Sequence, residues 1–272
     1  MSDYHQWDSI QSVTPTLCKI LNIDSPSLTS VNAHQSVIQA AKSAFNFQNA
    51  EKCLVFAPDA LGCHLHKQYT NLFNRVRQFA PVEIPVKSVM PSVTPVCFAS
   101  MFTGAAPAAH GITKYEKPVL TCDTIFDSLI RHGKKVAIVA VKDCSIDRIF
   151  RNRSLDYYSE ISDADVIKTT QKLIQQDIHD FILTYVQEYD DMLHETSPFA
   201  AAAIQGLQHH VEDFITINQA VLTSWSKYNF VVAFTPDHGA HFDEQINQGN
   251  HGEDIPEDME IIHFYGFHPK TR

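Results

Sequence analysis

Six short apolar runs, rich in branched and aromatic residues, recur along the chain and constrain its fold most. They lie at residues 52–58, 82–86, 134–141, 180–189, 229–236 and 259–266. Apolar runs of this length, separated by helical stretches, are typical of strands whose two faces are both covered. The chain is therefore expected to form an α/β fold, with a mostly parallel central sheet and helices on both faces.

The segments between the strands predict the helices. Apolar side chains three and four positions apart, as on one face of a helix, recur in residues 63–80, 122–133, 164–177 and 201–227. Gly133 is expected to end the second of these helices. Residues 1–50 predict a helical lead-in, and no repeat, low-complexity tract or linker divides the 272 residues. We expect one domain, residues 1–272, without a large cap domain.

Charge and hydropathy argue against several functional classes. The formal net charge is −10, and the densest basic run is RNRS at 151–154, which we interpret as a solvated turn. A nucleic-acid polymer is therefore not expected as a partner. The sequence has no apolar stretch of about 18 residues and no basic-then-apolar start, so we expect no membrane partner and a cytoplasmic location. The six cysteines form no CxxC pair and are expected to be free thiols.

Carboxylate and imidazole side chains follow three of the predicted strands. They are Asp59, Asp190, His194, Asp237 and His238. In open α/β sheets, ligands bind beyond the carboxyl ends of the strands, so these side chains are expected at one edge. Aspartate and neutral histidine are the usual non-thiolate ligands of zinc-like ions. The pattern favours a metal site there.

Taken singly, these residues also have ordinary structural interpretations. Asp59 can cap a turn before Gly62, and the sequence PDHG at 236–239 can form a polar turn. Thr94 precedes a helix of small residues, where the helix N-terminus favours an anion, but it can equally be an N-cap. The metal hypothesis explains all of these positions together, whereas the structural interpretation needs several coincidences.

Five motifs, in order, cover the chain from about residue 52 to residue 266. They are FAPDALG at 56–62, PSVTPVCFASMFTGAAPAAHGI at 91–112, YDDMLHETSP at 189–198, FTPDHG at 234–239 and NHGEDIPEDMEIIHFYG at 250–266. Together they resemble the alkaline phosphatase superfamily, and most of all its nucleotide pyrophosphatase/phosphodiesterase branch. The resemblance implies an alkaline phosphatase-like fold and a metal-dependent phosphohydrolase acting on small phosphate esters.

The resemblance also implies a site with two metal ions. One ion would be held by Asp190, His194 and His251, and the other by Asp59, Asp237 and His238, with Thr94 as the nucleophile touching the second ion. The resemblance, and not the spacing, selects Asp190 over Asp191. In-line attack by Thr94 would give a phosphothreonine. Zinc is the expected metal, although manganese or iron also suits such ligands.

Cys97 departs from the family pattern. Relatives often carry an asparagine three residues after the nucleophile, where its amide binds a phosphate oxygen, and Cys97 stands at that position. Because a thiol is a poor donor, its contact with substrate would be weak. A phosphomonoesterase or phosphomutase of the same superfamily, or a noncatalytic metal- or phosphate-binding protein, remains as an alternative function. The oligomeric state is left open.

The remaining histidines are given structural interpretations. They are His64, His66, His209, His210 and His263, together with His110 near the nucleophile helix. His241 follows His238 closely enough to lean over the site, but we leave it out of the ligand set.

Overall fold

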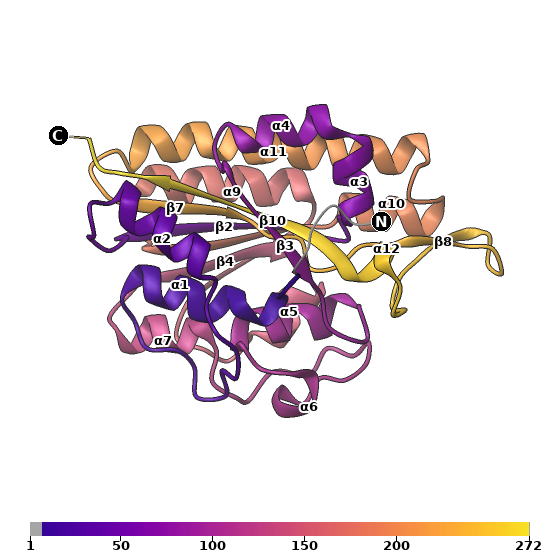
Figure 1. Ribbon diagram of the computed structural model, residues 1–272, viewed down its shortest axis with the longest axis horizontal. Helices are drawn as coiled ribbons and strands as arrows, with labels where there is room; N and C mark the ends of the chain where they lie inside the picture. Colours follow the sequence, from indigo (N-terminus) through magenta and orange to yellow (C-terminus); the bar gives the residue numbers. More distant parts are fainter. Residues whose placement is uncertain (1–6, 272) are drawn as a thin grey trace.

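The computed structural model describes residues 7–271, so the first six residues of the predicted lead-in lie outside the described part of the chain. A central sheet contains eight of the described strands (Figure 1). Their order is β1 (Asp8–Ser9), β3 (Val82–Lys87), β10 (Glu260–His268), β7 (Phe230–Phe234), β2 (Lys52–Pro58), β6 (Phe181–Val186), β4 (Val136–Val141) and β5 (Asp156–Glu160).

The sheet is mostly parallel, as predicted. Only β10, of the strands described in this sheet, runs against its neighbours, β3 and β7. Pro58 of β2 lies opposite Val186 of β6, and Phe56 lies opposite Phe234 of β7. The three central strands therefore end at the same edge, where ligands bind in open α/β sheets.

Helices cover both faces of the sheet (Figure 1). One layer contains α3 (Cys63–Gln68), α4 (Thr70–Arg77), α9 (Asp163–Gln176) and α11 (Ala201–Ser224). The other contains α1 (Val13–Leu21), α2 (Gln35–Ala44), α5 (Thr94–Thr103), α7 (Ile125–Arg131) and α8 (Ser145–Ile149). Leu54 and Phe56 of β2 belong to the first core, and Cys53 and Val55 to the second. This alternation explains why the strand is apolar throughout.

The end of the predicted strand at 180–189 is wrong. Strand β6 stops at Val186, and α10 (Glu188–Glu195) follows it almost directly. Tyr189 and Leu193 of this segment, four residues apart, are both buried, which is the pattern of a helix packed on one face. Helix α10 packs against α11.

Other differences concern small or exposed elements. The predicted helix at 63–80 is divided into α3 and α4 at Tyr69. The lead-in contains α1 and α2, but also the 3-10 turn at Ile10–Ser12 and strand β1, which pairs with β3. Strand β5 was not predicted, because it is a partly exposed edge strand without an apolar run.

Short elements after β7 complete this edge of the sheet. Strands β8 (His241–Asp243) and β9 (Gln248–Asn250) form a hairpin, and α12 (Pro256–Met259) leads into β10. Helix α6 (Pro107–His110) follows α5. Cys18, Cys53, Cys97, Cys122 and Cys144 are free thiols, as expected. No helix in the described part of the chain is long and apolar enough to cross a membrane.

Candidate active site

Two groups of three candidate metal ligands lie at the carboxyl edge of the sheet. One group is Asp190, His194 and His251, and the other is Asp59, Asp237 and His238. Within each group the ligand atoms lie within 4.8 Å of one another. The ring centroids of His238 and His251 are 4.1 Å apart, so the two groups adjoin. The structure thus brings together the two sets of residues that the family resemblance implied.

The group of Asp59, Asp237 and His238 is almost completely buried. Asp59 follows β2, and the other two residues follow the neighbouring strand β7. The Nε2 atom of His238 lies 3.4 Å from Asp59 Oδ1 and 3.3 Å from Asp237 Oδ2. Burial raises the pKa of both carboxyl groups and lowers the pKa of His238 to about 4. The imidazole therefore stays neutral, and a cation bound beside the two buried carboxyl groups would favour their charged form.

Helix α10 supplies two residues of the second group. Asp190 and His194 are four residues apart and share one face of the helix. Asp190 Oδ1 lies 3.4 Å from His194 Nε2 and 3.5 Å from His251 Nε2. The two Nε2 atoms are 3.1 Å apart. Burial raises the pKa of Asp190 well above its usual value and lowers the pKa of His251 well below.

Main-chain carbonyl groups orient all three imidazoles. The Nδ1 atoms pair with carbonyl oxygens as follows: His194 with Gly249 at 3.0 Å, His251 with Ser92 at 3.0 Å, and His238 with Gly239 at 2.9 Å. Since a carbonyl oxygen only accepts, each Nδ1 carries the hydrogen and each Nε2 presents a lone pair to its group. Two facing lone pairs repel each other unless a cation lies between them.

The carboxylates point to the same conclusion. Asp59 Oδ1, Asp190 Oδ1 and Asp237 Oδ2 are buried and have no hydrogen-bond donor among the described residues. Buried carboxylate oxygens without a partner are rare in stable proteins. Three carboxylates and three imidazoles, with no thiolate, fit two divalent cations.

Thr94 begins helix α5 beside the buried group. Its hydroxyl donates to Asp59 Oδ2 at 3.3 Å and lies 3.4 Å from His238 Nε2. The N-cap of this helix is Val93, whose side chain makes no cap hydrogen bond. The N-cap interpretation of Thr94 is therefore wrong, and its hydroxyl is directed to the ligand group.

Tyr185 is a site residue that the sequence reasoning missed. It lies on β6 and is almost completely buried, and its hydroxyl donates to Asp59 Oδ2. Burial keeps its pKa well above the ordinary value, so it remains a donor. The tyrosine and Thr94 thus share Oδ2 of Asp59, whereas Oδ1 has no donor among the described residues. A hydroxyl in an otherwise mainly aliphatic strand, FILTYV, was the available signal.

Two motif glycines allow the loops after β2 and β7 to approach each other. A Cβ atom on Gly239 would lie 2.0 Å from the main-chain oxygen of Glu257 and 2.7 Å from the Cα atom of Gly62. Real side chains do not tolerate such contacts, so an alanine there would push these loops apart. The loops carry Asp59 and Asp237.

We therefore expect Gly239→Ala to lower the free energy of unfolding by about 1–3 kcal/mol, the usual cost of overpacking. It should also weaken metal binding. Urea denaturation and zinc titration would measure the two effects. Gly111→Ala is the control, because its added Cβ meets nothing within 4 Å, although its φ of +89° makes alanine unfavourable there. Equal metal affinity in the two variants would contradict the prediction.

Several other histidines have structural partners. His263 Nε2 donates to the main-chain oxygen of Pro236 at 2.8 Å, and the main-chain N–H of Tyr189 donates to His210 Nε2 at 3.2 Å. Both contacts fix the backbone directly before a candidate ligand. His241 pairs with Asp258 at 2.8 Å, outside both groups.

Two further partners agree with the structural interpretations. His110 Nε2 lies 2.9 Å from the hydroxyl of Ser100 on α5, close to the nucleophile helix as expected. His209 pairs with Glu188 at 2.9 Å.

Cys97 is fully buried beneath the site. The Ser88 hydroxyl lies 3.1 Å from its sulfur, which also approaches the carbonyl oxygens of Val89 and Pro91 at 3.9 and 4.0 Å. Burial raises the pKa of this thiol well above its usual value. Its direct contact with substrate stays a prediction.

A hollow of about 170 Å³ opens beside Thr94. Its lining comprises Asp59, Thr94, Tyr115, Lys117, Lys142, Asp143, Cys144, Ser145, Tyr185, Gln187, Asp190 and Asp191. Neither lysine was predicted from the sequence. Lys142 directly follows β4, just as Asp59 follows β2, and this position was the available signal. A neighbouring hollow of about 340 Å³ shares Gln187 and Asp191 and adds the apolar side chains of Val141, Ile161 and Met192.

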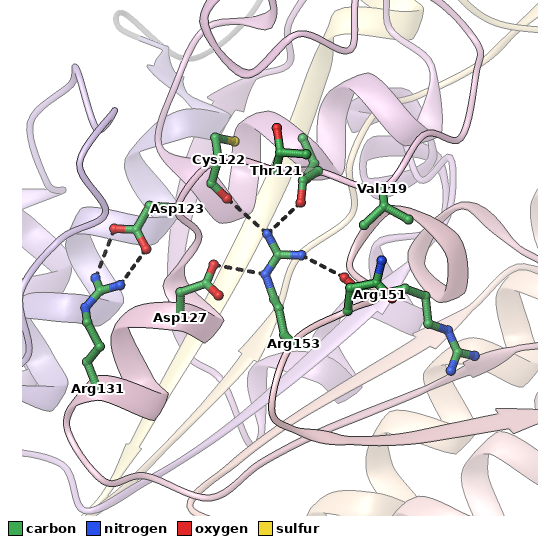
Figure 2. A pocket seen from close by; sticks show the side chains of 10 residues that line it. Val119, Thr121, Cys122, Asp123, Asp127, Arg131, Arg151 and Arg153 are labelled. Carbon is green, nitrogen blue, oxygen red and sulfur yellow. Dashed lines mark hydrogen bonds and ion pairs between the residues drawn. The ribbon is translucent and has the colours of Figure 1, made fainter.

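A larger cavity, about 570 Å³, lies among three arginines elsewhere in the fold (Figure 2). Arg131 makes a two-pronged ion pair with Asp123, and Arg153 pairs with Asp127 at 2.9 Å (Figure 2). The third, Arg151, pairs with Asp147. Because each guanidinium already has a carboxylate partner, this cavity is a weak site for an anion. The run 151–154 is thus tied into the fold rather than simply solvated.

Comparison with known proteins gives a family and several similar folds. The model of the type I phosphodiesterase / nucleotide pyrophosphatase family matches residues 53–263. No curated protein matches the chain.

Among solved structures, murine ectonucleotide pyrophosphatase/phosphodiesterase 5, in complex with AMP, is similar at a TM-score of 0.61 and 15% identity, over 80% of this chain and 88% of that one. The human protein of the same name has a TM-score of 0.59 and 14% identity, again over 80% of this chain and 88% of that one. Phosphonoacetate hydrolase from Sinorhizobium meliloti 1021, in complex with phosphonoformate, has a TM-score of 0.52 and 17% identity, over 70% of this chain and 57% of that one. These likenesses concern the fold.

Proposed function

The chain belongs to the type I phosphodiesterase / nucleotide pyrophosphatase family and is a phosphoric ester hydrolase, and we propose that Thr94 is its nucleophile. The observation that carries this proposal is the position of the Thr94 hydroxyl, 3.3 Å from Asp59 Oδ2 and 3.4 Å from His238 Nε2. The hydroxyl therefore adjoins two candidate metal ligands at the floor of a hollow that is open to substrate.

Two divalent metal ions, zinc in our proposal, would complete the site. Asp190, His194 and His251 would hold one ion, and Asp59, Asp237 and His238 the other. When bound, such ions supply Lewis-acid stabilisation of the negative charge that develops during phosphoryl transfer. Manganese or iron would suit the same oxygen and nitrogen donors.

The residues of the chain then have separate roles in two displacements. In the first, Thr94 Oγ forms a bond to phosphorus, the bond to the leaving alcohol breaks, and the threonine carries a phosphoryl group that retains the second ester. The Thr94 proton has Asp59 Oδ2 as its nearest carboxylate acceptor. In the second, water forms a bond to phosphorus, the bond to Thr94 breaks, and the hydroxyl recovers a proton.

Tyr185 keeps Asp59 in place for these steps. Its buried hydroxyl holds Oδ2 on the side of Thr94, so that the carboxylate cannot rotate without losing a hydrogen bond. Such outer partners of ligand carboxylates fix ligand orientation. The nucleophile is thus positioned before substrate arrives.

We propose a small phosphodiester or pyrophosphate-linked compound as the substrate. The murine relative was solved with AMP and the bacterial one with phosphonoformate, and both ligands are small phosphorus oxyanions. The hollow beside Thr94 and its neighbour offer space for an organic group of modest size.

We also propose that residues 1–272 act as one domain.

A phosphomonoesterase is the second candidate, and one observation favours it. A dianionic phosphoryl group needs cationic side chains near the nucleophile, and Lys117 and Lys142 line the hollow beside Thr94. The phosphomutase and noncatalytic alternatives gain no such support from the described residues.

Hydrolysis of bis(4-nitrophenyl) phosphate and of 4-nitrophenyl phosphate would test the proposal. The protein would be stripped of metal and reconstituted with zinc, and release of 4-nitrophenol would be followed by absorbance. We expect the diester to react about tenfold faster or more at equal concentration. A preference for the monoester would favour the second candidate, and no turnover of either ester would contradict a hydrolase.

A further inference from the structure

Two lysines of the active-site hollow have no role in the mechanism proposed above. Lys142 follows β4, whose neighbour in the sheet is β6, the strand that leads to Asp190. Lys117 lies on the loop between α6 and α7 and reaches the same hollow. Both side chains therefore line the hollow that Thr94 also lines.

Neither lysine has a carboxylate partner among residues 7–271. The Lys117 ammonium donates to the main-chain oxygen of Asp143 at 3.2 Å and lies 5.6 Å from the centroid of the Tyr115 ring. Lys142 forms no ion pair within this range. An ammonium group without a carboxylate partner can bind an anion that enters the hollow.

The carboxylates of the same hollow are engaged elsewhere. Asp143 pairs with Arg148 at 2.7 Å, and Asp191 accepts from the Gln187 amide at 3.1 and 3.3 Å. Asp59 and Asp190 belong to the two candidate metal groups. The lysines consequently remain free to bind an anion that comes with the substrate.

We propose that Lys117 and Lys142 form a subsite for a second anionic group of the substrate. This proposal rests on Thr94 being the nucleophile. The scissile phosphoryl group would lie at Thr94, and a compact oxyanion, either a carboxylate or a phosphate, would lie between the two ammonium groups. Because the hollow measures only about 170 Å³, a short link would join the two groups. The enzyme would thus prefer phosphodiesters that carry an additional negative charge over otherwise neutral ones.

Three esters that release 4-nitrophenol from the same bond would test this subsite. They are 4-nitrophenyl 2-carboxyethyl phosphate, its carboxamide analogue, which lacks the additional charge, and the analogue with a terminal phosphate in place of the carboxylate. Zinc-loaded wild type would be compared with Lys117→Met, Lys142→Met and the double variant. Lys114→Met is the matched control, since Lys114 is exposed on the same loop and pairs with Glu116 at 3.4 Å, outside the hollow.

For wild type we expect kcat/KM for the carboxylate or terminal-phosphate ester to exceed that for the carboxamide by a factor of at least about ten. One charge-assisted hydrogen bond supplies a factor of this size. The double variant should bring this ratio close to one, and Lys114→Met should keep it. Arginine at both positions should restore part of the preference. The larger of the two charged-ester ratios would identify the carboxylate or the phosphate as the source of the anion.

Different failures would be distinguishable. Equal kcat/KM for all three esters in wild type would overturn the subsite and leave the proposed hydrolase intact. If kcat/KM in the lysine variants fell by the same factor for all three esters, the lysines would act at the scissile phosphoryl group, and this would also overturn the subsite. No turnover of any ester by wild type would overturn the proposed function and this proposal with it.

Discussion

Replacement of Thr94 by alanine is expected to lower kcat for phosphodiester hydrolysis by at least about three orders of magnitude, with both metal ions still bound. Loss of the nucleophile has an effect of this size or larger in other hydrolases that form a covalent intermediate. The ligand groups should survive, because the hydroxyl is a neighbour of Asp59 and His238 rather than a member of either three-residue group. Elemental analysis would give the metal content, and steady-state kinetics the rate.

Thr94→Ser provides the matched control, since it retains the hydroxyl and removes only the methyl group. Its activity should lie between those of wild type and the alanine variant. If Thr94→Ala hydrolysed the diester at the wild-type rate, Thr94 could not be the nucleophile. If the alanine variant lost a metal ion as well, its low rate would not identify the nucleophile, and the serine variant would then decide.

The second large effect is expected at Asp190. Asp190→Asn should reduce the metal content from two ions to one and lower kcat/KM by at least about a hundredfold. The amide has about the volume of the carboxylate but lacks the negative charge that attracts a cation to the group formed with His194 and His251. Elemental analysis after gel filtration and the diester assay would measure the two losses.

Asp191→Asn is the matched control on the same helix. Its carboxylate accepts from Gln187 and belongs to neither ligand group, so this variant should retain two ions. Loss of a metal ion from Asp191→Asn but not from Asp190→Asn would reverse the choice between these adjacent aspartates. That choice came from the family resemblance, because the sequence spacing permits either residue.

Chelation of the metal ions should also lower stability. Three buried carboxylates lack a compensating charge without the ions, and burial raises the pKa of Asp59, Asp190 and Asp237. A ligand present at 100 times its dissociation constant stabilises the native state by about 2.7 kcal/mol. The midpoint of thermal unfolding should therefore fall on addition of a chelator and return with excess zinc. An unchanged midpoint would contradict metal binding by these groups.

Strands that are buried on both faces were the most predictable part of the fold. The run 52–58 coincides with β2, because all seven residues are buried and residues 53–57 pack alternately against the two helical layers. The direction of β10 was not predictable, since an apolar run has the same pattern whether its neighbours are parallel or antiparallel. The boundary after β6 failed because the aromatic Tyr189 suggested that the strand continues beyond Gln187 and Glu188, whereas it already lies on helix α10.

The candidate ligands that directly follow strands were visible in the sequence, because a residue such as Asp59 or Asp237 needs only the strand before it to define its place. His251 needed the family resemblance, since it follows the β8–β9 hairpin rather than a strand of the central sheet. Tyr185 and Lys117 were missed for different reasons. The first has the strand periodicity of a core residue, and the second belongs to a loop whose path no local pattern determines.

The stereochemical course at phosphorus tests the central claim, attack by Thr94, most directly. A phosphodiester made chiral by one sulfur atom would be hydrolysed in ¹⁸O-labelled water by the zinc-loaded protein, and the configuration of the product determined. Two successive in-line displacements, first by Thr94 and then by water, predict overall retention. Inversion would show that water attacks the substrate directly, and would contradict a covalent intermediate on Thr94.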